Sequence, residues 1–205
     1  MAQAISRDRL RVESFTGEAA RRHIPALAAL RIEVFRDFPY LYDGSLAYEE
    51  TYLRTYTESP DSVIAIAFDR DSVIGAATGL PLAHEPANVT ASFKGKGYDT
   101  ARIFYCGESV LKRAYRGQGL GVAFFEHREA WARRLGRFRE IAFCAVVRAA
   151  DHPRRPPDYV PLDSFWRKRG YAPVEGLECT MTWRDLDERE ETAKRMQFWM
   201  KDLAS

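Results

Sequence analysis

The sequence predicts an α/β fold in which a central twisted mixed sheet is flanked by helices. The first observation is a hydrophobic strand, a glycine-rich turn and an amphipathic helix, which follow one another between residues 102 and 134. The second is that β-rich runs alternate with helical patterns along the chain. The third is that 205 residues, 46% of them hydrophobic, can bury the core of one large domain.

Apolar periodicity places the elements in order. Period-two or continuous apolar runs predict strands at residues 10–15, 62–68, 73–80, 102–112, 139–147 and 177–183. Apolar residues at helical spacing predict helices at residues 18–36, 46–57, 122–134, 162–169 and 187–203. Polar composition predicts a long loop over the surface at residues 81–100. Four prolines exclude regular secondary structure from residues 148–161.

These elements divide the chain into two parts. Residues 8–185 are assigned to one domain, and residues 186–205 to a C-terminal helical extension. Met196, Trp199 and Leu203 lie on one side of the extension's predicted helix. An exposed apolar stripe of this kind favours packing either on the domain or on a second copy, and the second case would give a homodimer.

The glycine-rich turn Arg116-Gly117-Gln118-Gly119-Leu120-Gly121 carries the strongest chemical signal. The first amides of a helix have no partner within it and carry a partial positive charge. Glycines before such a start let a phosphate approach the backbone. The order of strand, turn and helix therefore predicts a phosphate or pyrophosphate site, with the charge of Arg116 at its edge.

Three glycine-loop patterns compete for this turn. A Walker loop requires Gly-Lys-Ser/Thr, which is absent. A dinucleotide fingerprint requires a third glycine where Val122 or Phe124 stands. The pattern Arg/Gln-x-x-Gly-x-Gly/Ala is filled by Arg116, Gly119 and Gly121. With its preceding strand, this segment resembles the acetyl-CoA-binding motif of the GCN5-related N-acetyltransferase (GNAT) family, whose element order matches residues 10–183.

The resemblance implies an acetyl-CoA-dependent N-acetyltransferase. The co-substrate would lie where the strands 102–112 and 139–147 part, and an amide near Leu111 would steady the developing oxyanion. No metal is implied, and no close cysteine pair suggests zinc. The residues expected to bind acetyl-CoA are Val110, Leu111, Lys112, Arg113, Arg116, Gly117, Gln118, Gly119, Leu120, Gly121 and Trp166.

Glu108 is the expected catalytic base. A lysine-type amine has a pKa of about 10.4, so it must lose a proton before it attacks. Glu108 precedes the place where the sheet opens, and Gly107 would permit a bulge that re-aims its side chain. The alternative is that Glu108 only pairs with a nearby arginine or lysine.

The expected general acid departs from the family pattern. Many GNAT proteins place a tyrosine four residues before the glycine that ends the last short helix, and here that position holds Trp166, before Gly170. An indole cannot protonate the leaving thiolate. Either another group donates the proton, with Tyr159 nearest in sequence and Tyr171 and Cys144 behind it, or the thiolate leaves without a donor. Trp166 would pack on the cofactor arm.

The loop at 37–44 is the expected acceptor side, because in GNAT proteins this connection commonly lines the acceptor site. Phe38, Tyr40 and Tyr42 are its candidates to contact substrate. The alternative is an aromatic-rich loop that covers the core.

Composition excludes several other classes of function. A net charge of +2 gives no strong field for nucleic acid or membranes, and no apolar window is long enough to span a bilayer. The absence of an evident signal peptide and the three scattered cysteines favour a cytoplasmic protein. Two alternatives to a small-molecule or protein N-acetyltransferase stay open: a non-catalytic acyl-CoA-binding module, and an interaction subunit that uses the tail helix.

Overall fold

The structure is a computed structural model that describes residues 9–204. Its helices are α1 (Glu18–Arg21), α2 (Ile24–Phe35), α3 (Leu46–Glu58), α4 (Ala87–Gly95), α5 (Leu120–Leu135) and α6 (Asp163–Arg167). Its strands are β1 (Leu10–Phe15), β2 (Val63–Asp69), β3 (Ser72–Pro81), β4 (Ile103–Tyr105), β5 (Ser109–Leu111), β6 (Glu140–Val146), β7 (Ala172–Trp183) and β8 (Thr192–Asp202).

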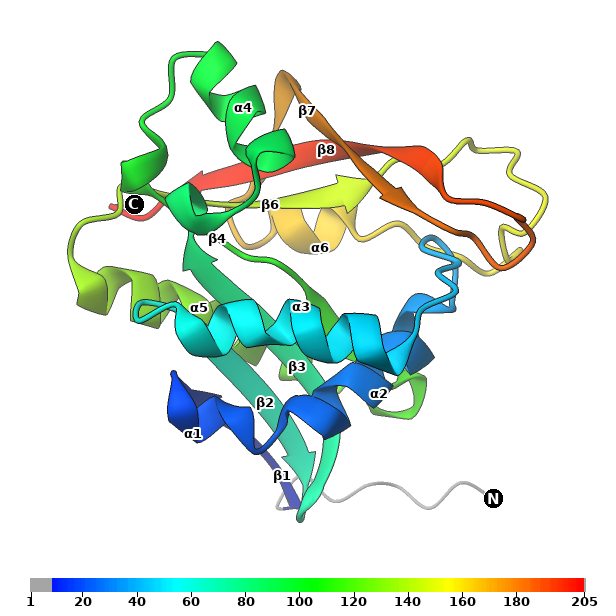
Figure 1. Ribbon diagram of the computed structural model, residues 1–205, viewed down its shortest axis with the longest axis horizontal. Helices are drawn as coiled ribbons and strands as arrows, with labels where there is room; N and C mark the ends of the chain where they lie inside the picture. The colour runs from blue at the N-terminus through cyan, green and yellow to red at the C-terminus, as the bar shows by residue number, and fades with distance from the viewer. Residues whose placement is uncertain (1–8, 205) are drawn as a thin grey trace.

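The described strands form one mixed sheet in the order β1-β2-β3-β4-β6-β8-β7, and β5 pairs with β3 next to β4 (Figure 1). β4 and β6 run parallel and are joined by α5, whereas the other paired strands are antiparallel. The predicted mixed sheet is therefore confirmed. The parallel pair matters most for the position of the site, because the sheet opens next to it.

Helices cover both faces of the sheet (Figure 1). On one face α2, α3 and α4 bury Leu27, Leu53 and Phe93 against the sheet, and on the other α5 buries Phe124 and Phe125. Along β6 the side chains alternate between these two cores, as the period of a strand requires. We refer to the two sides as the α3 face and the α5 face.

The predicted helix over residues 18–36 is two helices. α1 ends at Arg21 and α2 begins at Ile24, with Pro25 in its first turn. Proline is tolerated there because its missing N–H has no helical partner anyway. Pro25 thus marks the true start of the longer helix.

The predicted surface excursion at 81–100 contains α4. Val89 and Phe93 lie one helical turn apart and are buried on the α3 face. The side chain of Ser92 donates to the Glu178 carbonyl of β7 (2.7 Å), which ties the helix to the sheet. The prediction failed because these two apolar residues stand among polar ones that hide the pattern.

The prediction of a C-terminal helical extension over residues 186–205 is wrong. Residues 192–202 form β8, which pairs with β6 on one side and with β7 on the other. Met196 and Phe198 are buried on the α3 face and Trp199 on the α5 face. The domain boundary at 185/186 is wrong for the same reason, because β8 lies inside the sheet.

Candidate active site

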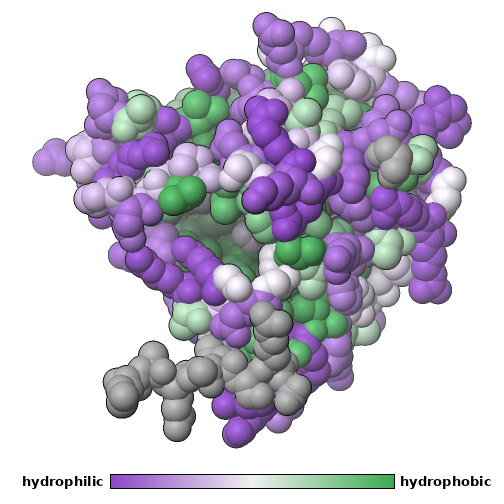
Figure 2. All heavy atoms as spheres, turned by 180° about the vertical axis from the view of Figure 1, so that it is seen from behind, coloured by the Kyte–Doolittle hydropathy of each residue, from purple (hydrophilic) through white to green (hydrophobic). Residues whose placement is uncertain are grey.

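The predicted strand over residues 102–112 is broken at 106–108, where the chain changes its pairing partner. The Cys106 amide donates to the Ala142 carbonyl of β6 (2.8 Å), whereas the Gly107 amide donates to the Thr78 carbonyl of β3 (3.2 Å). Beyond this point β5 pairs with β3 alone, so β5 and β6 part and leave a gap. Figure 2 shows the face opposite to that of Figure 1, where the surface is hollowed over an apolar floor with a largely hydrophilic rim.

Two side chains fix this break from opposite faces. A Cβ at Gly107 would lie 2.0 Å from the Tyr56 hydroxyl, so only glycine fits there. Arg128 of α5 is buried and donates to the carbonyl oxygens of Glu108 (3.1 Å) and Thr78 (3.4 Å). Each of these two oxygens also accepts a backbone amide, because Thr78 donates to Glu108 (3.1 Å) and Gly107 donates to Thr78 (3.2 Å), so Arg128 adds a second donor to both. Sequence reasoning missed Arg128, because one more arginine in a charged helix carries no signal.

Two amides of β5 face the gap. In antiparallel pairing, alternate residues point their backbone groups toward the partner strand and away from it. The Lys112 amide donates to the Ile74 carbonyl of β3 (3.0 Å). Leu111 and Ser109 therefore point their amides into the gap, where an extended ligand can pair with them as a further strand.

This alternation refines the predicted cofactor contacts on β5. Val110 is buried, and by the same alternation its amide faces β3. The Lys112 amide is engaged within the sheet, and the Lys112 ammonium pairs with Glu33 of α2 (2.8 Å). Among the predicted strand residues, Leu111 is therefore the one whose amide faces the gap.

The glycine-rich turn at the end of the gap has the geometry of an anion site. Gly117 (φ 78°) and Gly119 (φ 87°) adopt the left-handed conformation that favours glycine, and Gly119 precedes the first turn of α5. A Cβ on either residue would meet nothing within 4 Å, so the space beside the turn is open. Within residues 9–204, no group accepts a hydrogen bond from the amides of Gly119, Leu120 and Gly121. These amides and the helix dipole fit a phosphate.

Arg116 lies along the gap between this turn and the loop at 37–44. Its guanidinium donates to the Leu111 carbonyl oxygen (3.3 Å) and pairs with Asp37 (3.6 Å). Arg113 forms an exposed pair with Asp158 (3.4 Å). Both cations lie on flexible exposed side chains that can turn to a bound phosphate.

Two further residues of the turn make contacts within the protein. The Gln118 side chain donates to the Ala114 carbonyl (3.4 Å). A Cβ on Gly121 would lie 3.3 Å from the ring of Phe165, which brings α6 against the start of α5. Close helix packing therefore accounts for Gly121 independently of any ligand.

Trp166 and Tyr159 take different positions. Trp166 of α6 packs edge-on against Phe143 and Trp199, with ring centroids 5.0 Å apart in both pairs, and lies partly buried against the core on the α5 face. Tyr159 is half-buried and packs edge-on against Phe38 (4.7 Å). Burial raises the pKa of Tyr159, Arg155 opposes this and Asp163 adds to it. The phenol therefore keeps its proton at neutral pH, as an acid must.

The three aromatic residues of the loop at 37–44 face different partners. Phe38 lies against Tyr159, and Tyr40 packs against Phe35 (4.7 Å). Burial and the neighbouring carboxylate of Glu49 on α3 raise the pKa of Tyr42. Burial raises the pKa of Tyr40, and the charge of Glu108 contributes to the shift. Tyr40 thus lies near the break in the sheet, together with the pair of Phe38 and Tyr159.

Glu108 projects onto the α3 face and is held there. Its carboxylate pairs with Arg31 of α2 (2.6 Å) and accepts from the Tyr52 hydroxyl (3.1 Å). Arg31 also pairs with Glu49, and its side chain is 10% exposed. Glu108 therefore does pair with a nearby cation, as the alternative interpretation of this residue expected. The base role stays a prediction.

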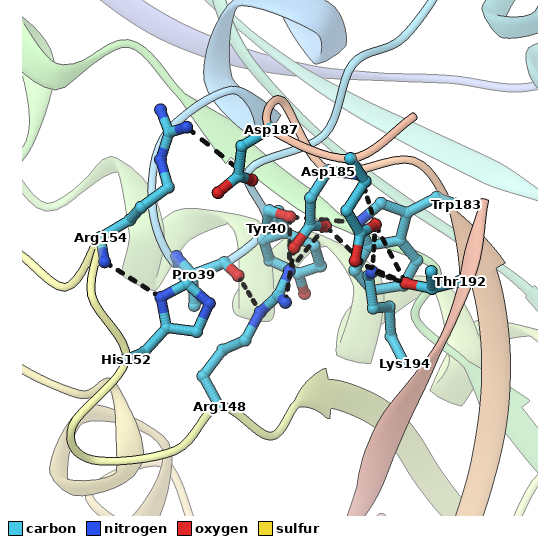
Figure 3. Close-up of polar contacts among 11 residues, drawn as sticks. Pro39, Tyr40, Arg148, His152, Arg154, Trp183, Asp185, Asp187, Thr192 and Lys194 are labelled. Carbon is cyan, nitrogen blue, oxygen red and sulfur yellow. Dashed lines mark hydrogen bonds and ion pairs between the residues drawn. The ribbon is translucent and has the colours of Figure 1, made fainter. Parts of the chain in front are cut away.

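One arginine joins three distant segments beside this site (Figure 3). Arg148 follows β6 and donates to the carbonyl oxygens of Pro39 (2.7 Å) and Tyr40 (2.8 Å). It also pairs with the carboxylate of Asp185 (2.7 Å), which Lys194 approaches from β8. The loop at 37–44 is thereby fastened to β6 and to the β7–β8 connection.

Metal-binding clusters and membrane-spanning helices are both absent from the described residues. Residues 9–204 contain no cluster of three or more histidine, cysteine, aspartate or glutamate side chains arranged to hold a metal ion. No helix in this part of the chain has the length and apolarity needed to cross a membrane.

Comparison with known proteins agrees with this geometry. The model of the acetyltransferase (GNAT) family matches residues 27–156, which is more than half of the chain and includes the break, the gap and the glycine-rich turn. No curated protein sequence is detectably similar to the chain.

Solved structures share the fold at low sequence identity. A ribosomal-protein-alanine N-acetyltransferase from Brucella melitensis superposes with a TM-score of 0.60 at 13% identity, over 94% of this chain and 99% of that one. A GCN5-related N-acetyltransferase from Kribbella flavida gives 0.57 at 19%, over 96% and 99%. A protein from Salmonella typhimurium, solved with its cofactor acetyl-CoA, gives 0.59 at 10%, over 95% and 94%.

Proposed function

The chain belongs to the acetyltransferase (GNAT) family, and we propose that it transfers an acetyl group from acetyl-CoA to an amine of a small molecule or protein. The transfer proceeds by direct attack within a ternary complex. The observation that carries this proposal is the gap between β5 and β6, with the open amides of Gly119, Leu120 and Gly121 at its end.

The residues that line the gap fit two parts of acetyl-CoA, the pyrophosphate and the pantetheine arm that carries the thioester. The pyrophosphate meets the orphan amides at the start of α5, with Arg116 beside them. The pantetheine arm pairs with the open edge of β5. The Leu111 amide then lies where a thioester carbonyl would develop negative charge.

The acceptor amine approaches from the α3 face. Glu108, Tyr52 and Tyr40 lie there, next to the break through which the gap opens. A carboxylate and phenol hydroxyls suit an amine that arrives as an ammonium. Tyr159 is the proposed proton donor to the leaving thiolate, since its hydroxyl keeps its proton.

The test is amine-dependent release of the CoA thiol. The purified protein is incubated with acetyl-CoA and a panel of primary amines, and free thiol is measured. Release that exceeds hydrolysis with at least one amine is the expected result. Binding of acetyl-CoA without any amine-dependent release would favour the alternative, a non-catalytic acyl-CoA-binding module.

Leu111→Pro is the matched variant for this assay. Proline removes the amide that faces the gap but breaks no bond to β3, because that amide points away from it. Loss of one such donor typically lowers turnover about 10²- to 10³-fold. Unchanged turnover in a folded Leu111→Pro protein would show that another group stabilises the oxyanion.

A further inference from the structure

A buried chain of ion pairs on the α3 face leads to Glu108. Arg31 lies within α2, and its guanidinium pairs with Glu49 of α3 through Nε and with Glu108 at the break through Nη1 (2.6 Å). The Glu49 side chain is fully buried, and those of Arg31 and Glu108 are 10% and 5% exposed. Three charged groups from three segments are thus removed from water together.

Aromatic rings fix the guanidinium between the two carboxylates. Its central carbon lies 4.4 Å from the ring centroid of Tyr52 and 5.0 Å from that of Phe35. In the part of the chain that the structure describes, neither carboxylate pairs with any other lysine, arginine or histidine. Arg31 is therefore the one cation through which Glu49 can act on Glu108.

The two oxygen atoms of the Glu108 carboxylate have different surroundings. Oε2 receives both the ion pair with Arg31 and the hydrogen bond from the Tyr52 hydroxyl (3.1 Å). Between residues 9 and 204, no donor makes a hydrogen bond to Oε1. Three side-chain atoms in this range are buried without a hydrogen-bond partner, and Glu108 Oε1 is not among them. Solvent therefore reaches Oε1, which can accept a proton.

The backbone of Glu108 is held independently of its side chain. Its carbonyl oxygen accepts from the Thr78 amide (3.1 Å) and from the Arg128 guanidinium (3.1 Å), and its amide donates to the Thr78 hydroxyl (3.3 Å). Only the side-chain torsions of Glu108 are left to vary. The contacts to Oε2 therefore decide where Oε1 points.

Stability alone does not account for these ion pairs. Desolvation of buried charges is costly, and their pairing returns that cost only in part. Glu49 Oε1 and Arg31 Nη1 are also buried without a hydrogen-bond partner. Well-packed apolar side chains would stabilise the contact between α2 and α3 at least as well. They could not, however, hold one oxygen of a carboxylate and leave the other open.

We propose that Arg31 and Glu49 are positioning residues for the acetyl transfer. Glu49 holds Arg31, Arg31 holds Oε2 of Glu108, and Oε1 is thereby presented to the acceptor amine as the proton acceptor. This inference rests on the proposed function. It also joins the two interpretations of Glu108, because the ion pair uses one oxygen and the base uses the other.

Atoms and charges balance in this step. The ammonium R–NH₃⁺ gives one proton to Oε1 of Glu108 and becomes R–NH₂. Its lone pair forms the C–N bond at the thioester carbonyl, and the C–S bond breaks. Tyr159 gives a proton to the CoA thiolate and regains, through water, the one that the nitrogen loses. The products are the acetamide, the CoA thiol and protonated Glu108, which returns its proton to water.

The first test compares two substitutions of Glu49. Glu49→Ala removes the oxygen that receives Arg31 Nε, so the guanidinium can shift and take Oε2 with it. We expect kcat, measured as thiol release with the amine that the wild type uses best, to fall about 10²-fold, a typical cost of a misplacement of about 1 Å. Glu49→Gln keeps an oxygen for Nε and should stay close to wild-type kcat. KM for acetyl-CoA should be unchanged in both variants.

The second test separates positioning from a general loss of structure. In Glu108→Gln the proton acceptor is absent, and kcat should be about 10²- to 10⁴-fold lower than in the wild type. If Glu49 acts through Glu108, the addition of Glu49→Ala to Glu108→Gln lowers kcat no further. A purely structural role would lower kcat by the same factor in both backgrounds.

Two further variants secure the comparison. Glu18→Ala is the control expected to keep wild-type kcat, because Glu18 pairs with Arg21 on α1 and both side chains are exposed to water. Circular dichroism and calorimetry with acetyl-CoA verify that each variant is folded and binds the co-substrate. Should Glu49→Ala not fold, Arg31→Lys takes its place. Lysine keeps the charge but lacks the planar fork that spans both carboxylates, so the same loss is expected, only where Glu108 is present.

Each outcome separates this inference from the proposed function. Wild-type kcat in folded Glu49→Ala, a Glu49→Gln variant as slow as Glu49→Ala, or equal losses in the two backgrounds overturns the positioning role and leaves the proposed function intact. Glu108→Gln with wild-type kcat overturns the base and the positioning role together. A wild type that binds acetyl-CoA but acetylates no amine overturns the proposed function itself, and this inference with it.

Discussion

Arg148 illustrates how single side chains assemble this site from distant parts of the chain. Its side chain is 11% exposed and bridges the carbonyls of Pro39 and Tyr40 to the carboxylate of Asp185 (Figure 3). Lys194 lies 3.4 Å from the same carboxylate and neutralises part of its charge. Arg148 therefore holds the loop at 37–44 together with the bridge between Tyr42 and Asp185 and the Trp183 indole N–H, which donates to the Tyr40 carbonyl (3.1 Å).

Removal of this guanidinium should destabilise the protein. Arg148→Met leaves the Pro39 carbonyl and most of the Asp185 charge without their donor, whereas the Tyr40 carbonyl keeps the Trp183 indole N–H. We expect the free energy of unfolding to fall by about 2–4 kcal/mol, below the full cost of a broken buried pair because Lys194 remains. Urea denaturation measures the change.

Arg184→Met is the matched control. Arg184 pairs with Asp43 on the same loop, but both side chains are partly exposed to water, and pairs near the surface contribute about 0–1 kcal/mol. Equal losses in the two variants would show that Arg148 does not hold the loop.

At the scale of single residues, the sequence allowed prediction of those positions whose residue type is required by the local backbone conformation. Gly117 and Gly119 adopt left-handed conformations, and the motif that contains them was recognised from spacing alone. Contacts between distant residues were not accessible. The pairing of Arg31 with Glu108 and the bonds of Arg128 to the break depend on the tertiary fold.

Among the elements, β8 shows where periodicity misled the prediction. Met196, Trp199 and Leu203 stand at helical spacing and are all buried, but they enter two different cores. Phe198 is also fully buried, between the rings of Phe93 (4.6 Å) and Tyr105 (6.4 Å). A strand inside the sheet buries both of its faces, so its apolar residues need not follow one period.

Phe198→Ala distinguishes the strand from the predicted surface helix. In β8 the ring lies in the core, and its removal should lower the free energy of unfolding by about 3–5 kcal/mol. A helix with Met196, Trp199 and Leu203 facing inward would turn Phe198 toward solvent, and the change would then be small. Chemical denaturation provides the measurement.

Arg195→Ala supplies the comparison. Arg195 precedes the same buried stretch of β8, and its side chain is 63% exposed and pairs with Glu178 of β7. Such an exposed pair contributes about 0–1 kcal/mol. A loss in Phe198→Ala no larger than in Arg195→Ala would contradict the buried strand.

For the whole molecule, the break in the sheet and the glycine-rich turn act together. β4 keeps its pairing with β6 while β5 turns to β3, and α5 begins at the end of the gap this leaves. The strand–turn–helix order could be predicted because it is local. The sheet order, with β8 between β6 and β7, could not, because it brings together segments that are far apart in the sequence.

The central claim is that the turn before α5 binds the pyrophosphate of acetyl-CoA, and calorimetric titration with acetyl-CoA tests it most directly. Gly119→Asp places a negative charge in the anion site. Gly136→Asp is its match: Gly136 ends the same helix, is also left-handed (φ 72°), and would also place its Cβ in open space.

We expect the wild type and Gly136→Asp to bind acetyl-CoA equally well. Gly119→Asp should bind at least about 100-fold more weakly, since juxtaposed like charges cost several kcal/mol. A wild type that does not bind acetyl-CoA, or a Gly119→Asp variant that binds as well as Gly136→Asp, would contradict this claim.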